Sequence, residues 1–184
     1  MRRSSEDTKA AILTAARKRF ADDGYERATI RAVASDAGID PSMVMRYFGN
    51  KQGLFASAVE FDLRLPDLRD TPRDELGRAL AAHLVDRWSE TDILRVLLRS
   101  AVTNPDAAER MRTIFADQLG TLVARLDTDP AEAAQRAGLL ATQALGFELC
   151  RHILELPPVV DLTREEAIDW LAPTMQHYLT GPRT

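Results

Sequence analysis

The chain has 184 residues, enough for one domain or for one domain with a small appendage. Its 24 Lys and Arg residues and 28 Asp and Glu residues give a net charge of -4, so any nucleic-acid binding must come from a local basic surface. The 45% of hydrophobic and 28% of charged residues are typical of a folded globular protein. A single cysteine excludes an intramolecular disulfide and a multi-cysteine zinc site, and we expect neither a metal nor a cofactor.

The apolar residues are distributed as in an all-α protein. Val and Ile are sparse beside Ala and Leu, and strict alternation of apolar and polar residues is absent. No apolar run approaches about 18 residues, so we expect a cytoplasmic protein without membrane contact. Residues 1–65 have a net charge of +2 and residues 66–184 one of -6, which indicates a head that faces a polyanion and an acidic body.

Proline and glycine divide the sequence into about nine helices. The first is expected over residues 5–23, ended by Gly24, and the second from a cap at Thr29 to Gly38. The third begins after a cap at Asp40 and ends at residues 49–50. A fourth is expected over 51–65. The five that follow are expected over residues 73–89, 92–103, 105–126, 130–156 and 163–180.

Residues 29–48 have the pattern of a helix, a tight turn and a second helix, with a connection of the length that a helix-turn-helix requires. On a helical wheel of about 100° per residue, one half of the second helix holds Pro41, Val44, Met45 and Phe48. The other half holds Ser42, Met43, Arg46 and Tyr47. An ordinary amphipathic surface helix would present Glu and Lys there, whereas this half has no acid. Its hydroxyl, apolar, guanidinium and phenol groups suit the major groove of DNA.

Residues beside these helices are candidates for phosphate contacts. Thr29 begins a helix, so its hydroxyl and the free N–H groups of the first turn form an anion site, with Arg31 at the same end. Lys51 begins the next helix, where a cation is unfavourable unless an external anion is bound. The alternatives are a solvated Lys51 and an ion pair of Arg31 with Asp36 or Glu26.

The run ILTAARKRFADDGYERATIRAVASDAGIDPSMVMRYFGNKQGLFASAV, residues 12–59, resembles the N-terminal DNA-binding domain of the TetR family of bacterial repressors. The matching features are F-x-x-x-G-aromatic, T-I-x-x-apolar-A, A-G-apolar at the turn, aromatic-F before the break, and K-x-x-L-F. The resemblance implies an all-α homodimer, usually regulated by a small ligand. By position it implies DNA contacts from Thr29, Ser42, Met43, Arg46, Tyr47 and Lys51.

Met45 departs from this family pattern, which most often has a tyrosine that touches phosphate at that position. Met45 cannot donate a hydrogen bond, which leaves that contact open and gives Tyr47 more of the backbone anchoring. We expect residues 1–50 to form a three-helix helix-turn-helix domain that binds a double-stranded DNA operator. Residues 51–184 are expected to form an α-helical ligand-binding and dimerisation domain, with residues 51–65 as the connector.

The helices expected over 130–156 and 163–180 are candidates for a homodimer interface. The first is apolar nearly all round and must be buried on two sides, one of which is expected to be the partner subunit. Two such helices from each chain would make a four-helix interface. The alternative is an internal core without a partner. The candidate interface residues are Ala134, Gly138, Ala141, Leu145, Trp170 and Thr174.

The middle helices are expected to enclose an unidentified small-molecule effector. The candidate pocket residues are Leu84, Trp88, Arg95, Arg99, Met111, Phe115, Phe147, Cys150 and Arg151. Arg95 and Arg99 lie four residues apart on an otherwise apolar helix, so one of them is a candidate to face an anionic ligand; pairing with Asp92 and Glu90 at the surface is the alternative. Glu148, next to Phe147, would suit a cationic ligand instead.

These features favour a transcriptional regulator, expected to be a repressor that a hydrophobic or amphiphilic ligand releases from a palindromic operator. Two recognition helices of a dimer would enter successive major grooves about 34–36 Å apart. The sequence has no phosphate-binding glycine loop, no H-E-x-x-H and no G-x-S-x-G, so nothing in it supports an enzyme. The alternative is a constitutive or architectural DNA-binding protein without an effector, and a cavity in the body would discriminate between the two.

Overall fold

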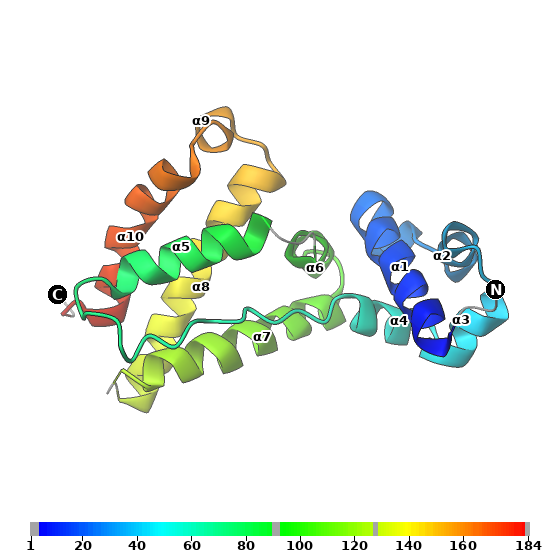
Figure 1. The fold of residues 1–184 in the computed structure, drawn as a ribbon, viewed down its shortest axis with the longest axis horizontal. Coiled ribbons are helices and arrows are strands. Elements are labelled where there is room, and N and C mark those ends of the chain that lie inside the picture. The colour runs from blue at the N-terminus through cyan, green and yellow to red at the C-terminus, as the bar shows by residue number, and fades with distance from the viewer. Residues whose placement is uncertain (1–3, 90–92, 127–128, 183–184) are drawn as a thin grey trace. The chain divides into compact units, whose positions relative to one another are not determined.

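A computed structural model describes residues 4–89, 93–126 and 129–182, and these residues form ten α-helices and no strand (Figure 1). The expected all-α class is confirmed. The helices are α1 (Ser5–Arg27), α2 (Ile30–Ala37), α3 (Pro41–Phe48), α4 (Lys51–Ala58), α5 (Leu76–Ser89), α6 (Ile93–Ala101), α7 (Pro105–Ala124), α8 (Pro130–His152), α9 (Pro157–Val160) and α10 (Arg164–Thr180). No helix among the described residues is long and apolar enough to span a membrane.

The chain divides into two compact units. The first contains Met1–Phe61 and Asp92–Ala108, and the second contains Asp62–Thr91 and Glu109–Thr184. This division differs from the boundary expected at residue 50, because α4 and α6 both pack against α1. The sequence pattern marks where these helices begin, but it does not identify their neighbours.

In the first unit, α1 packs against α2, α4 and α6. Arg19 of α1 forms an ion pair with Asp36 of α2, and Arg17 Nε donates to the Ala58 carbonyl at the end of α4 over 2.9 Å. The residues expected to face inward, Ile12, Ala16 and Phe20, are buried. Gly24, the expected stop of the first helix, has φ 75° and ψ 166°, so the regular helix breaks there before the turn that ends at Arg27.

The connecting segment, defined here as residues 59–75 between α4 and α5, is not the helix that the sequence predicted as far as Leu65. The helix ends at Ala58, and residues 60–68 are extended, with Arg64 at φ 50°. Phe61 and Leu63 are nevertheless buried. The prediction failed because the spacing of the apolar residues fits a helix as well as this extended path.

Three side chains of the second unit bind the backbone of the connecting segment. Leu63 N–H donates to Gln118 Oε1 over 2.8 Å, and His83 Nε2 lies 2.8 Å from the Leu63 carbonyl oxygen. The Arg87 guanidinium donates to the Asp62 carbonyl over 2.9 and 3.1 Å. These bonds satisfy backbone groups that a helix would satisfy internally, so they stabilise the extended form.

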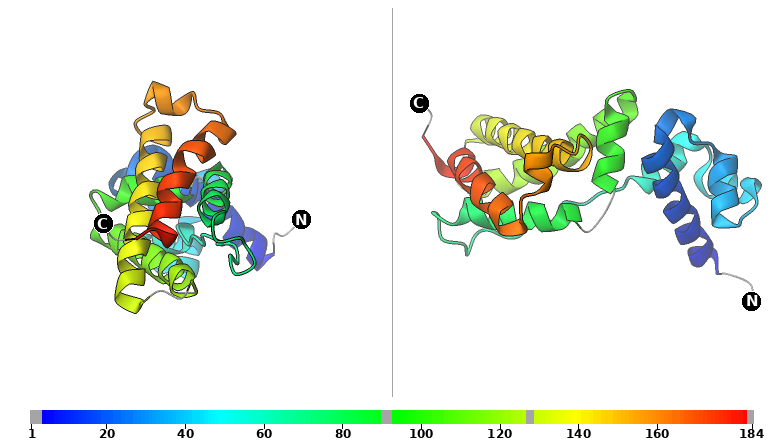
Figure 2. Two further views of the ribbon diagram at one scale, coloured as in Figure 1. Left: turned by 90° about the vertical axis from the view of Figure 1, so that its left-hand side faces the viewer. Right: turned by 90° about the horizontal axis from the view of Figure 1, so that it is seen from above.

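The rest of the second unit consists of α5 and α8 packed against α10, and Figure 2 shows α8 and α10 side by side. The helix expected over 130–156 ends at His152, and α9 follows it as a helix that the sequence did not predict. Leu154 and Leu156 N–H groups bind back to the carbonyls of Leu149 and Cys150, and Glu155 has φ 50°. These contacts end α8 and turn the chain before it reaches Pro157 and Pro158, which the sequence predicted as the end of the helix.

Gly77 is the point of closest approach between α5 and α10, and we predict that Gly77→Ala destabilises the protein. A Cβ at Gly77 would lie 2.5 Å from the Ala172 carbonyl oxygen and 2.5 Å from Gln176 N. Overpacking of this kind costs about 1–3 kcal/mol. Gly120→Ala on α7 is the control, because a Cβ there meets nothing within 4 Å and should stabilise the helix by about 0.5–1 kcal/mol. Urea unfolding at one protein concentration measures both; equal midpoints would contradict the prediction.

Candidate functional site

The pair α2 and α3 has the local geometry of a helix-turn-helix. The Thr29 hydroxyl accepts from Ala32 N–H over 3.1 Å at the start of α2, and Gly38 ends that helix in the left-handed conformation (φ 65°, ψ 41°). Asp40 then accepts from Ser42 N–H over 2.8 Å, with Pro41 at the first position of α3. The residues buried at this packing are Val33, Ala34, Val44 and Phe48. The second helix is therefore held firmly while its other side stays open.

The open side of α3 is the one that the sequence predicted. Ser42 and Arg46 are exposed, and Met43 and Tyr47 are half-buried. Within the described residues, no side-chain hydrogen bond or ion pair engages Arg46. The helical wheel was wrong for Met45, which is 45% exposed rather than turned inward, whereas Val44 and Phe48 of the same half are buried.

The flanking candidates differ in how much of their polar surface is available. Arg31 is exposed, and its expected alternative partner Asp36 pairs with Arg19 instead. The Lys51 ammonium donates to the Glu26 carbonyl over 2.9 Å and lies 4.6 Å from the centroid of the Tyr25 ring. Lys51 therefore has protein partners that the sequence did not reveal, whereas the Arg31 guanidinium has no side-chain partner among the described residues.

Two of the predicted contact residues have hydrogen bonds within the protein. The Tyr47 hydroxyl lies 3.0 Å from Ser5 Oγ, an exposed pair that joins α3 to the start of α1. The Ser42 side chain and the Ser42 backbone N–H, which donates to Asp40 Oδ1 over 2.8 Å, lower the pKa of that carboxyl. Asp40 is therefore a negative charge at the N-terminus of α3, where the helix dipole favours it.

The candidate pocket residues of the second unit lie in or beside its core. Leu84, Trp88, Met111 and Phe115 are buried, and Phe147, Cys150 and Arg151 are half-buried. The rings of Trp88 and Phe147 stack with their centroids 5.7 Å apart. Trp88 Nε1 is buried and has no hydrogen-bond partner among the described residues. A buried donor without an acceptor is costly, so this N–H group is a candidate to bind a ligand acceptor.

Two of the predicted pocket residues belong to the first unit, whereas that core belongs to the second. Arg95 and Arg99 lie in the first unit, and Arg99 is exposed, with its guanidinium donating to the Ala21 carbonyl of α1 over 3.1 Å. The alternative partners proposed for them, Asp92 and Glu90, lie outside the described residues. Sequence spacing placed both arginines on one helix, but it did not show that this helix packs on α1.

Arg151 and Glu148 of α8 both contact groups of the second unit itself. The Arg151 guanidinium lies 5.7 Å from the Phe147 ring centroid and donates to the carbonyls of Val159 (2.9 Å) and Leu162 (2.8 Å), which ties α8 to the chain after it. Glu148 is fully buried, with its Oε2 3.7 Å from His152 Nε2. The sequence singled out Glu148 but could not show its burial.

Comparison with known proteins decides the family. The description "Bacterial regulatory proteins, tetR family" matches residues 12–58, and "Tetracyclin repressor-like, C-terminal domain" matches residues 74–179. The chain belongs to the TetR family. It is a helix-turn-helix transcriptional regulator, as the resemblance over residues 12–59 predicted. Among the described residues no cluster of His, Cys, Asp and Glu could hold a metal ion.

Relatives of this TetR-family chain cover nearly all of it. An uncharacterized HTH-type transcriptional regulator of Mycobacterium tuberculosis is 28% identical in an alignment 182 residues long, which covers 95% of this chain and 94% of that protein. A TetR-like transcriptional regulator from Rhodococcus sp. RHA1 has the same fold, with a TM-score of 0.70 and 18% identity over 98% of this chain and all of that one. NalD, the secondary repressor of the MexAB-OprM multidrug efflux pump in Pseudomonas aeruginosa, has a TM-score of 0.67 and 24% identity. The match covers 96% of this chain and 98% of NalD.

The lowered pKa of Asp40 predicts a pH-dependent contribution to stability. A carboxyl whose pKa is lower in the folded state stabilises the fold above its unfolded pKa, and that stabilisation is lost as the pH falls through the folded pKa. Asp40→Asn keeps an oxygen that can cap α3 but removes the titration. The free energy of unfolding should therefore fall less for Asp40→Asn than for the wild type between about pH 5 and pH 3. Asp70→Asn, at another exposed carboxylate, is the control, and identical curves for Asp40→Asn and wild type would contradict the argument.

Proposed function

We propose that this TetR-family regulator is a repressor that binds a palindromic operator as a homodimer and releases it when a small hydrophobic or amphiphilic molecule binds its helical body. The observation that supports operator binding most directly is the open side of α3. It presents the unengaged Arg46 guanidinium next to Ser42 and Met43, without an acidic residue on that side. Arg is the commonest bidentate reader of guanine in the major groove.

Contacts to the DNA backbone would come from the ends of the neighbouring helices. Thr29 caps α2, whose first-turn N–H groups are oriented for phosphate, and Arg31 is free to pair with the same phosphate. The Tyr47 hydroxyl would donate a hydrogen bond to phosphate. Met45 cannot make such a contact, because its side chain has no hydrogen-bond donor. Lys51 would contribute only if DNA displaced its ammonium from the Glu26 carbonyl.

The α8 and α10 surface supports a homodimer. Trp170 on α10 is 76% exposed, and Leu139 on α8 is 46% exposed. Ala134 and Gly138 leave the α8 surface open to close approach, and a Cβ at Gly138 would meet nothing within 4 Å. Ala141, Leu145 and Thr174, also predicted for the interface, are half-buried. Large apolar side chains exposed on adjacent helices are typical of a surface that a partner covers.

The effector proposal is supported by the core of the second unit. The buried Trp88 Nε1–H has no acceptor among the described residues, and its ring stacks on Phe147. An apolar molecule with one acceptor would satisfy that donor. Its differential affinity for the two conformations of the dimer would shift the spacing of the α3 helices and release the operator. Footprinting of DNA upstream of the gene, without and with candidate ligands, tests the whole proposal.

Arg46 and Arg31 form a matched pair for testing DNA recognition, since neither guanidinium has a side-chain partner among the described residues. Arg46→Ala should weaken specific operator binding by about 1–3 kcal/mol and relax the preference at one base pair. Arg31→Ala should weaken binding to all sequences equally and lower the salt slope by about 1. Titrations on operator and random DNA at several salt concentrations measure both. Equal losses on every sequence for Arg46→Ala would contradict its role as a base reader.

Gly138→Arg should convert the dimer into a folded monomer, because it puts an unpaired charge into the proposed α8–α10 interface. Sedimentation should show the monomer, and operator affinity should be lost with the dimer. Gly120→Arg, the same substitution at an open helical glycine of α7, is the control and should remain dimeric. A wild-type chain that sediments as a monomer at micromolar concentration would refute the interface.

A further inference from the structure

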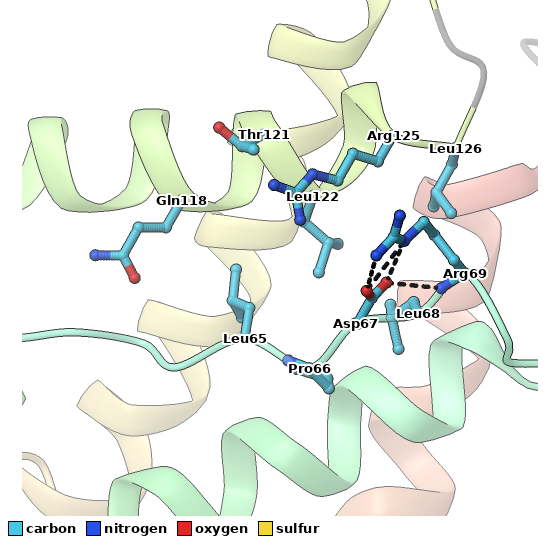
Figure 3. Close-up of a pocket in the computed structure, with 10 residues that line it drawn as sticks. All are labelled: Leu65, Pro66, Asp67, Leu68, Arg69, Gln118, Thr121, Leu122, Arg125 and Leu126. Carbon is cyan, nitrogen blue, oxygen red and sulfur yellow. Dashed lines mark hydrogen bonds and ion pairs between the residues drawn. The ribbon is translucent and has the colours of Figure 1, made fainter.

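A groove of the second unit lies between the connecting segment and the C-terminal half of α7 (Figure 3). Residues 65–69 form one wall, and Gln118, Thr121, Leu122, Arg125 and Leu126 form the other. This part encloses about 70 Å³. An open hollow of about 310 Å³ adjoins it beside Thr71, Arg73 and Leu76. The groove and the hollow share residues 68–69 and 125–126 in their lining, so one continues into the other. The inner part has room for more than a single water, and the outer hollow has the volume of a small-molecule site.

The charge of the groove is positive. Arg69 binds Asp67 through Nε at 2.9 and 3.0 Å, and this guanidinium lowers the Asp67 pKa to about 2. Asp67 is therefore ionised; Arg69 is its hydrogen-bonded partner, and the charge of Arg125 acts on it more weakly. The guanidinium groups of Arg125 and Arg73 make no side-chain hydrogen bond or ion pair with the described residues. Two positive charges on the groove's rim are left for an external anion.

The walls between these charges are apolar. Leu65 of the connecting segment and Leu122 of α7 point into the space between the two elements (Figure 3). Leu68 and Leu126 continue the apolar lining to the outer hollow, where Leu76 joins them. A purely hydrophilic anion would leave these side chains uncovered, whereas a molecule with an apolar body would cover them.

We propose that this groove is a binding site for an amphiphilic anion, whose carboxylate or phosphate pairs with Arg125 and Arg73 and whose apolar body packs on Leu65 and Leu122. The site is distinct from the Trp88 core. Its occupancy is expected to oppose operator binding, and only this regulatory consequence rests on the proposed function.

The groove can influence the connecting segment through Gln118. Gln118 lines the groove, and its Oε1 accepts the Leu63 N–H group that fixes the extended segment. Residues 65–67 have no backbone hydrogen bond to another element among the described residues, so this wall can adjust to an occupant. The segment continues α4, which follows α3 after two residues, so a change in its anchoring acts on the chain that leads to the recognition helix.

Calorimetric titration of the full chain with decanoate, below its micelle concentration, tests the binding. Decanoate should bind, while inorganic phosphate, decanol and decyltrimethylammonium, which lack either the apolar body or the negative head, should bind at least about tenfold more weakly. The double variant Arg73→Gln with Arg125→Gln should lose at least about tenfold in decanoate affinity. Arg112→Gln is the matched control. Arg112 is an exposed arginine of α7 that pairs with Glu109, and this variant should bind decanoate as the wild type does.

Undiminished decanoate binding by the double variant, or preferred binding of the cation, overturns the groove as an anion site, whatever happens with DNA. In a parallel operator titration, decanoate should weaken DNA binding by the wild type and by Arg112→Gln but not by the double variant. Decanoate binding that depends on the two arginines, in a protein that binds no operator, would overturn the proposed function and leave the groove standing. Arginine-dependent binding without any effect on operator affinity would overturn the regulatory consequence.

Discussion

Hydrogen bonds between three side chains and the backbone of residues 62 and 63 hold the extended segment with which the second unit begins. Gln118, His83 and Arg87 satisfy an N–H group and two carbonyls that would otherwise belong to a helix. A longer α4 would lose these bonds and would lift Leu63 from its buried position. The extended connecting segment, the groove beside it and the beginning of the second unit all follow from this anchoring.

In the DNA-binding helices, local capping decides where each helix begins and ends, and tertiary packing decides which side of it is buried. Caps at Thr29 and Asp40 and the left-handed Gly38 define the two helices and the turn between them. Packing of α2 on α1 and of α3 on α2 and α4 then buries one side of the pair. On the other side, Arg46 and Arg31 have no side-chain partner among the described residues, while Lys51 is bound to the end of α1. Lys51 would therefore have to break a hydrogen bond within the protein before it could contact DNA, whereas Arg46 and Arg31 would break no side-chain bond to the described residues.

The arginines illustrate why charge on an apolar helix is a weak guide to a ligand site. Arg99 donates to an α1 carbonyl, and Arg151 to two carbonyls beyond α8. Both guanidinium groups have acceptors in the fold, because long side chains can reach backbone carbonyls that remain free at helix ends and in turns. Arg73 and Arg125, which have no such acceptor among the described residues, lie at the groove beside the connecting segment.

The sequence by itself determined the helical class, the caps and breaks of the first three helices, and the outward positions of Ser42, Met43, Arg46 and Tyr47, because these depend on residues within a few positions of one another. It also identified the family, through spacings within residues 12–59. Only the tertiary structure decided that α4 stops at Ala58, that α6 packs on α1, and that Lys51 has partners at the end of α1. Each of these depends on groups at least 20 residues apart in the chain, such as Leu63 and His83, and local periodicity contains no information about such pairs.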